Sequence, residues 1–168
     1  AEKFKISRES QDEFALWSQQ KAEIAKQSGF FNDEIAPISI PQRKKDPIIF
    51  GHDEFPRANS SIDSLSGLRA VFKKEGSVTA GNSSGLNDGA AALLIASENA
   101  VRVNSMKPLA RIVSAAVSGV EPRIMGIGPV YASQKALKQA GLTLDDMDVI
   151  EMNEAFSAQV LSCSRELG

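Results

Sequence analysis

The segment from residue 7 to residue 28 repeats small and apolar side chains at helical spacing, which predicts a helix. The residues of this repeating face are Phe14, Ala15, Ser18, Ala22 and Ala25. Ser7 is a favoured N-cap, and Glu9 and Asp12 stand near the positive end of the helix dipole. Gly29 is a residue type that commonly ends a helix, and we expect the helix to stop there.

Residues 30–59 follow neither the helical nor the strand period. Prolines break both kinds of element, and this stretch contains Pro37, Pro41, Pro47 and Pro56. We expect short strands and long loops, with residues 37–41 as a brief edge strand. Loops longer than about 12–15 residues are usually functional or disordered, so the stretch is a candidate binding region.

Helices and strands alternate in the predicted order from residue 64 onward. The pattern predicts helices over 64–76, 88–99, 128–141 and 154–167, and strands over 77–80, 109–120 and 148–152. From residue 77 the order is therefore β-α-β-α-β-α. That alternation favours an α/β fold with a mostly parallel sheet and crossover helices.

Composition and charge exclude a few functional classes and do not identify one. The chain has 168 residues, 42% of them hydrophobic, and a net charge of −2, which gives no basic surface for nucleic acid. No stretch approaches the roughly 18 apolar residues of a membrane span. A single cysteine excludes an internal disulfide and fits a reducing compartment. We therefore expect a cytoplasmic protein that binds no nucleic acid and does not cross a membrane.

Two segments carry candidate chemistry. Residues 80–92 read Ala-Gly-Asn-Ser-Ser-Gly-Leu-Asn-Asp-Gly-Ala-Ala-Ala, a run of small residues that lets a backbone lie close to a ligand. Neither of the glycine patterns typical of nucleotide-binding loops is present, which weakens a phosphate-binding interpretation. Residues 153–159 read Asn-Glu-Ala-Phe-Ser-Ala-Gln and follow a predicted strand, where α/β sheets bind ligands. From the residues alone, Asn153 is either a helix N-cap or a ligand-facing group.

In this order and at this separation, the two segments resemble those of the thiolase family, enzymes that make or cleave 3-ketoacyl-CoA thioesters. The similarity runs from about Ser7 to the last residue. It implies an α/β thiolase-like fold fragment, part of a layered α/β/α/β/α architecture plus an irregular loop domain. Residues 1–86 would be most of the loop domain, 87–107 a return segment of the N-terminal core half, and 108–168 the first part of the C-terminal core half.

The resemblance assigns a catalytic role to Asn153. In thiolases, the Asn of Asn-Glu-Ala-Phe holds a water that, with a histidine, donates hydrogen bonds to a thioester oxygen. Donors held in place in this way stabilise the enolate that forms at the α-carbon. The same side chain is also able to cap a helix.

The resemblance also implies a set of coenzyme A contacts. Ala80, Ser84, Leu86 and Phe72 match positions along the pantetheine arm, whereas Arg57 and Ser64 match positions near the adenine. Met125, in a Met-Gly-Ile-Gly-Pro segment, matches a residue at the reactive end of the pocket. From the residues alone that segment is equally a turn, and Arg57 is equally a solvated loop charge. The implied cofactor-binding residues are Arg57, Ser64, Phe72, Ala80, Ser84, Leu86, Met125, Ala155 and Phe156.

Thiolases also use two cysteines and a histidine from a Gly-His-Pro motif, and this sequence contains none of these motifs. Cys163 lies inside the last predicted helix, in line with Phe156 and Val160, which favours an inert buried thiol over a nucleophile. His52 stands in a charged loop without a second histidine or cysteine nearby, so we expect surface exposure and no metal site.

The sequence therefore supports two functional hypotheses. The first is a thiolase-type acyltransferase that carries out thiolysis of 3-ketoacyl-CoA, or the reverse condensation of acetyl-CoA with an acyl-CoA. The second is a non-catalytic thiolase-like protein that binds acyl-CoA or lipid. The chain begins with Ala1, and we expect it to be an internal fragment that is inactive alone.

The first hypothesis carries further expectations. Coenzyme A would be a substrate, with no separate cofactor, and the parent enzyme would be a homo-oligomer, either a dimer or a tetramer, of fatty acid metabolism. We also expect the isolated chain to self-associate or to be poorly stable, because missing strands would leave sheet edges and apolar helix faces uncovered.

Overall fold

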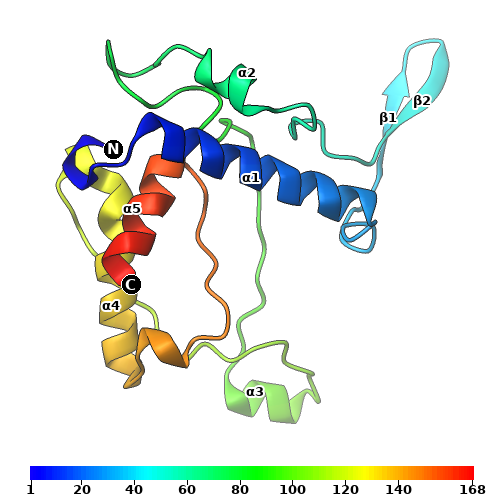
Figure 1. The fold of residues 1–168 in the computed structure, drawn as a ribbon. Helices are drawn as coiled ribbons and strands as arrows, with labels where there is room; N and C mark the ends of the chain where they lie inside the picture. The colour runs from blue at the N-terminus through cyan, green and yellow to red at the C-terminus, as the bar shows by residue number, and fades with distance from the viewer. The chain divides into compact units, whose positions relative to one another are not determined.

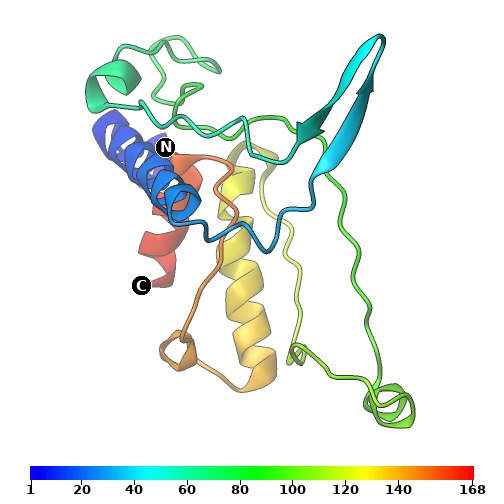
Figure 2. The same cartoon turned by 90° about the vertical axis from the view of Figure 1, so that its right-hand side faces the viewer.

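The structure is a computed structural model that describes residues 1–168 (Figures 1 and 2). The chain divides into two compact units. The first comprises Ala1–Gly85 and Glu154–Ser162, and the second comprises Leu86–Asn153 and Cys163–Gly168. The elements in chain order are η1 (Glu2–Phe4), α1 (Arg8–Gln27), β1 (Ile38–Gln42), β2 (Lys45–Phe50), α2 (Ile62–Ser66), α3 (Glu98–Val103), η2 (Pro122–Ile127), α4 (Gly128–Ala140), η3 (Leu144–Asp146) and α5 (Ser157–Leu167).

Helix α1 is the longest element of the first unit, and it confirms the helix predicted over residues 7–28. The Ser7 side chain accepts a hydrogen bond from the Ser10 backbone N–H, as expected of an N-cap. Gly29 follows the helix with a φ of 73°, a left-handed conformation that glycine adopts without strain. The buried face of α1 contains Gln11, Asp12 and Ala15, and α1 packs against α2 (Figure 1).

Strands β1 and β2 form an antiparallel hairpin, which confirms the edge strand expected at residues 37–41. Ile38 pairs with Phe50 and Ile40 pairs with Ile48, so these four apolar side chains share one face. All four side chains are exposed. The hairpin stands clear of α1 and α2 (Figure 2).

The helix predicted over residues 64–76 is much shorter in the structure. Helix α2 ends at Ser66, and Val71 instead donates a backbone hydrogen bond to Val78. The Arg8 guanidinium donates to the carbonyls of Leu65 and Leu68 just where the helix ends. The strand predicted at 77–80 is likewise reduced to an isolated antiparallel bridge between Ala70 and Thr79.

The second unit contains the best-predicted helix after α1. Helix α4 starts with Pro129 in its first turn and ends at Gly141, which has a φ of 69°. The Ser114 hydroxyl donates to the Ala136 carbonyl at 2.9 Å and ties the preceding segment to α4. Ile127 and Val130 are buried at the start of the helix.

Four other predictions for the second half of the chain are wrong. The helix predicted over 88–99 is absent, and α3 begins only at Glu98. An apolar run without helical periodicity does not distinguish a helix from a buried strand. The segments predicted as strands over 109–120 and 148–152 form no ladder with any other part of residues 1–168. The last helix begins at Ser157 rather than residue 154.

The structure adds one finding on membranes. None of the helices combines the length and the apolar character that crossing a bilayer requires.

Candidate functional site

Parts of the two segments that the sequence singled out, residues 82–84 and 155–157, lie against each other in the first unit. The Ser84 backbone N–H donates to the Ala155 carbonyl at 2.9 Å, and the Ser157 N–H donates to the Asn82 carbonyl at 3.0 Å. Ser83 and Phe156 form an antiparallel bridge between them. The small-residue loop and the Asn-Glu-Ala-Phe segment are therefore joined backbone to backbone, although more than seventy positions separate them in the sequence.

An aromatic pair adds a third segment to this junction. The rings of Phe72 and Phe156 meet edge to face, with centroids 5.9 Å apart and planes at 78°. This geometry is favourable by about 0.5–1.5 kcal/mol beyond the burial of area. The structure thus brings together four of the predicted binding residues, Phe72, Ser84, Ala155 and Phe156. Ala80 is exposed and lies two residues before Asn82.

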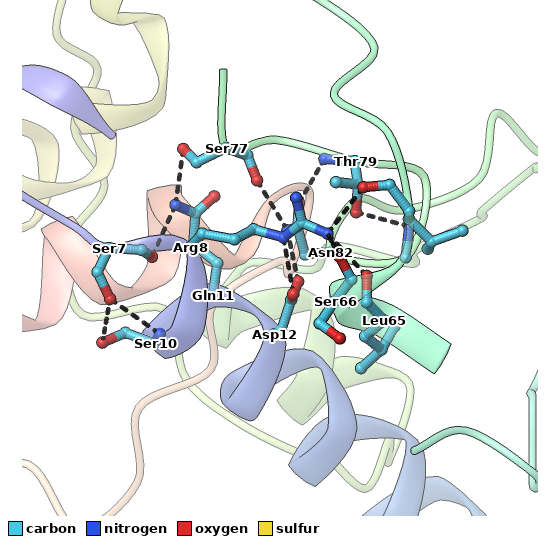
Figure 3. Close-up of polar contacts among 12 residues, drawn as sticks. Ser7, Arg8, Ser10, Gln11, Asp12, Leu65, Ser66, Ser77, Thr79 and Asn82 are labelled. Carbon is cyan, nitrogen blue, oxygen red and sulfur yellow. Dashed lines mark hydrogen bonds and ion pairs between the residues drawn. The ribbon is translucent and has the colours of Figure 1, made fainter. Parts of the chain in front are cut away.

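The loop is held from its other side by a buried polar network (Figure 3). The Asn82 side-chain amide donates to Asp12 Oδ1 at 2.9 Å, and its oxygen accepts from the Thr79 N–H at 2.8 Å. Asp12 Oδ2 in turn accepts from Arg8 Nε at 2.7 Å. Asp12 and Asn82 are each only 2% exposed, and the two hydrogen bonds of the Asn82 side chain to Asp12 and Thr79 are buried.

Beside the junction is a hollow of about 240 Å³. Its lining residues are Phe14, Ala15, Ser18, Gln19, Ala22, Phe55, Pro56, Gly81, Asn82, Ser83, Ser84, Glu154 and Ser157. Small and polar groups face two aromatic rings there, those of Phe14 and Phe55. The Glu154 carboxylate accepts a hydrogen bond from the Ser18 hydroxyl and lies 3.9 Å from Lys21 Nζ.

Arg57 and Ser64 have local partners. The Arg57 backbone N–H donates to Gln19 Oε1 at 2.7 Å, and the Arg57 guanidinium carbon lies 6.0 Å from the centroid of the Phe55 ring. Arg57 comes directly after Phe55 and Pro56, which both line the hollow. Ser64 forms a capping box with Ser61 at the start of α2, where its hydroxyl donates to the Ser61 carbonyl at 2.8 Å.

Comparison with known proteins decides the family. The description "Thiolase, N-terminal domain" matches residues 1–99, and "Thiolase, C-terminal domain" matches residues 106–168. The chain belongs to the thiolase family. Curated relatives include the beta-ketoadipyl-CoA thiolase of Acinetobacter baylyi, which is 55% identical over 168 residues, all of this chain and 42% of that protein. The acetyl-CoA acetyltransferase of Chromobacterium violaceum is 54% identical and is covered to 43% of its length.

Solved structures show the same relationship. The Bacillus anthracis acetyl-CoA acetyltransferase matches with a TM-score of 0.91 and 49% identity, covering 99% of this chain and 42% of that one. Human mitochondrial 3-ketoacyl-CoA thiolase in complex with CoA matches with a TM-score of 0.88 and 52% identity, covering 98% of this chain and 40% of that one. The thiolase-like α/β fold is confirmed, and the chain spans about two fifths of the length of these relatives.

Three predicted site residues of this thiolase chain belong to the second unit. Leu86 and Met125 have exposed side chains, and Met125 lies in η2. Asn153 is the last residue before the chain returns to the first unit at Glu154. Because α5 begins at Ser157, Asn153 does not cap that helix, and the N-cap alternative for this residue is excluded.

Cys163 is fully buried in α5, and its thiol donates to the Gly126 carbonyl at 3.2 Å. Burial raises the pKa of the Cys163 thiol, which disfavours the nucleophilic thiolate. The expectation of an inert thiol is consistent with this environment. His52 is exposed, with its ring centroid 6.2 Å from that of Phe50. No group of three or more potential metal-ligating side chains occurs among residues 1–168.

Sequence reasoning missed the groups that hold the loop. The sequence places Asp12 near the helix dipole and Asn82 in a run of small residues, yet the two side chains are hydrogen-bonded to each other in the interior. The available signal was the Arg8–Asp12 spacing of four on the buried side of α1, which places an ion pair on that face. No sequence pattern of this kind predicts the contact between Glu154 and Ser18.

Proposed function

We propose that these residues form the central part of a thiolase-type acyltransferase acting on 3-ketoacyl-CoA and acetyl-CoA. In thiolysis, the sulfur of coenzyme A forms a new thioester with the β-carbonyl carbon as the bond between the α- and β-carbons breaks. The α-carbon takes up a proton to replace that bond, the thiol gives one up, and acetyl-CoA leaves. The reverse reaction forms that carbon–carbon bond. The observation that carries the proposal is the backbone junction between the small-residue loop and the Asn-Glu-Ala-Phe segment, made by Ser84 and Ala155.

The junction has the features needed for an extended thioester arm. Small side chains around Ser84 allow the arm to lie close to the backbone, and the rings of Phe72 and Phe156 offer it an apolar edge. Ala80 and Leu86 would also contact the arm, as the family resemblance implies. Related structures include one described as a complex with CoA, which supports coenzyme A as the ligand.

The remaining assignments belong to the same proposal. Asn153 would hold the donor that stabilises the enolate, and Met125 would line the reactive end of the pocket. Arg57 and Ser64 would lie toward the adenine. Coenzyme A is a substrate in this scheme, and no separate cofactor is required. The domain division at residues 86 and 107 stays a prediction, as do a cytoplasmic location, a homo-oligomeric parent and a role in fatty acid metabolism.

The test is CoA-dependent thiolysis of acetoacetyl-CoA, followed by the loss of its enolate absorbance. The 168-residue chain is assayed beside the intact protein that carries this sequence. We expect activity in the intact protein alone, because this chain has neither thiolase cysteine motif nor a Gly-His-Pro histidine. Activity in the chain by itself would overturn the assigned mechanism. An intact protein that binds acyl-CoA without turnover would favour a non-catalytic binding protein instead.

A further inference from the structure

We propose that Asp12, held by Arg8, is a positioning residue that fixes the small-residue loop against the Asn-Glu-Ala-Phe segment and thereby sets the affinity for coenzyme A. Asp12 does not line the hollow beside that junction. Its effect would therefore be indirect, through Asn82. This inference rests on the proposed function, and it concerns residues to which the family resemblance assigned no role.

The first step is the buried contact between Asp12 and Asn82. The Asn82 amide nitrogen donates to Asp12 Oδ1 at 2.9 Å and to the Ser77 carbonyl at 3.1 Å, while its oxygen accepts from the Thr79 N–H at 2.8 Å. All three hydrogen bonds fix the orientation of one planar group. The loop around Asn82 therefore has one geometry that satisfies its interior polar atoms (Figure 3).

The second step is the anchor behind Asp12. A carboxylate that is 2% exposed must be paired, and Arg8 Nε supplies that pairing at 2.7 Å. The same guanidinium donates through Nη2 to the carbonyls of Leu65 at 2.7 Å and Leu68 at 2.9 Å. Asp12 is thus tied to the end of α2 as well as to its own helix, and it has little freedom to follow a displaced loop.

The third step is the link from Asn82 to the site. The Asn82 carbonyl accepts from the Ser157 N–H at 3.0 Å, and two residues later the Ser84 N–H donates to Ala155 at 2.9 Å. A shift of Asn82 therefore moves the residues that face the proposed pantetheine arm. The positions of Ser84 and of the Phe156 ring both depend on the position of Asn82.

Leucine side chains of the α2 region pack against the loop at Gly81. A Cβ atom added at Gly81 would lie 2.6 Å from Leu65 Cδ2 and 2.6 Å from Leu68 Cδ1, so the loop is already in contact with the α2 region. Movement of the loop toward α2 would require these two leucine side chains to shift.

The decisive variant is Asp12→Asn in the intact protein. The new amide would oppose either Arg8 Nε or the Asn82 amide nitrogen with its own donor, whichever way it is turned, because it has one acceptor oxygen in place of two. We expect KM for coenzyme A to rise on the order of tenfold, while kcat changes less than threefold. A purely structural role would lower the melting temperature and the active fraction and leave KM unchanged.

A pair of variants gives a rescue test. Asn82→Asp alone would place two carboxylates at hydrogen-bond distance in the interior and should be more severe than Asp12→Asn. The double variant Asp12→Asn/Asn82→Asp exchanges amide and carboxylate, so Arg8, the Thr79 N–H and the contact between residues 12 and 82 again have donor and acceptor matched. The ion pair with Arg8 is lost, and a carboxylate oxygen faces the Ser77 carbonyl in place of its donor. We expect the double variant to recover part of the affinity that Asn82→Asp loses. Glu13→Gln, the same kind of change at the exposed neighbour on α1, is the matched control.

Direct binding of coenzyme A by calorimetry on the same variants separates the two proposals. If the wild-type protein binds coenzyme A but shows no thiolysis, the proposed function fails, while a weakened affinity in Asp12→Asn still supports positioning. If thiolysis is present and Asp12→Asn leaves both KM and affinity unchanged, the positioning role is overturned. A double variant no better than Asn82→Asp would overturn it as well.

Discussion

Whether a cysteine reacts depends on its surroundings more than on its presence in a family of cysteine enzymes. Cys163 is fully buried, its thiol is engaged with the Gly126 carbonyl, and its pKa is raised by burial. We expect Cys163→Ala in the intact protein to keep its thiolysis rate within about threefold, since the thiol is a packing group. Thiol titration of the native and denatured protein, together with the rate of the variant, checks this. Rapid modification of native Cys163 with loss of activity would contradict it.

The role proposed for Asn153 makes a different prediction. Asn153→Ala in the intact protein should lower kcat by about 10²–10³-fold, because a group that binds a developing oxyanion acts mainly in the transition state. The dissociation constant for coenzyme A should change much less. Single-turnover kinetics beside calorimetry measure the two quantities. Equal losses in both would mean that Asn153 contributes to binding and not to chemistry.

At the residue scale, local chemistry was predictable and distant pairing was not. Ser7 as an N-cap and Cys163 as a buried thiol follow from their neighbours within one or two helical turns. The Asp12–Asn82 hydrogen bond joins residues 70 positions apart and leaves no periodic pattern in either segment. The convergence of Phe72, Ser84 and Phe156 came from a family resemblance, because no local spacing predicts it.

At the scale of elements, two helices predicted with start and stop signals at both ends formed close to their predicted bounds. Helices α1 and α4 carry their start and stop signals within the chain, at Ser7, Gly29, Pro129 and Gly141. The strands predicted over 109–120 and 148–152 depend on neighbours that no sequence window contains. A ladder requires two segments that pair, so the sequence of one segment does not show whether a ladder forms.

The cap of α4 supplies an element-scale prediction. Gly141 has a φ of 69°, and a Cβ there meets no other atom within 4 Å, so only the backbone conformation is at issue. We expect Gly141→Ala to lower the free energy of unfolding by about 1 kcal/mol. Gly141→Asn is the matched control, because Asn tolerates the left-handed conformation, and it should cost less than Gly141→Ala. Urea denaturation of the intact protein measures both. Equal costs for the two variants would contradict the argument.

At the scale of the whole molecule, the exposed surface is large for the size of the chain. The chain exposes 13579 Å², whereas a folded monomer of 18.0 kDa is expected to expose roughly 8,000 Å². Much of the excess is apolar, and it includes Leu86, Leu93, Leu94, Leu109 and Val117. Apolar surface of this extent favours association.

We therefore expect the 168-residue chain on its own to self-associate or to melt without cooperativity. Sedimentation velocity at several concentrations and a thermal scan would measure this, with the intact protein as the comparison. A sharp, concentration-independent melting transition in a monomeric sample would contradict the prediction.

The division of the first unit into two separate stretches has a consequence for synthesis on the ribosome. Its first stretch ends at Gly85 and its second begins at Glu154. At about 5–20 residues per second, roughly 3–14 s pass between them. During that interval the nascent chain contains both Asp12 and Asn82, but the acceptor for the Ser84 N–H has not yet been made. The groups that hold the loop on one side are therefore translated well before the groups on its other side, and the junction is complete only when the Asn-Glu-Ala-Phe segment has been translated.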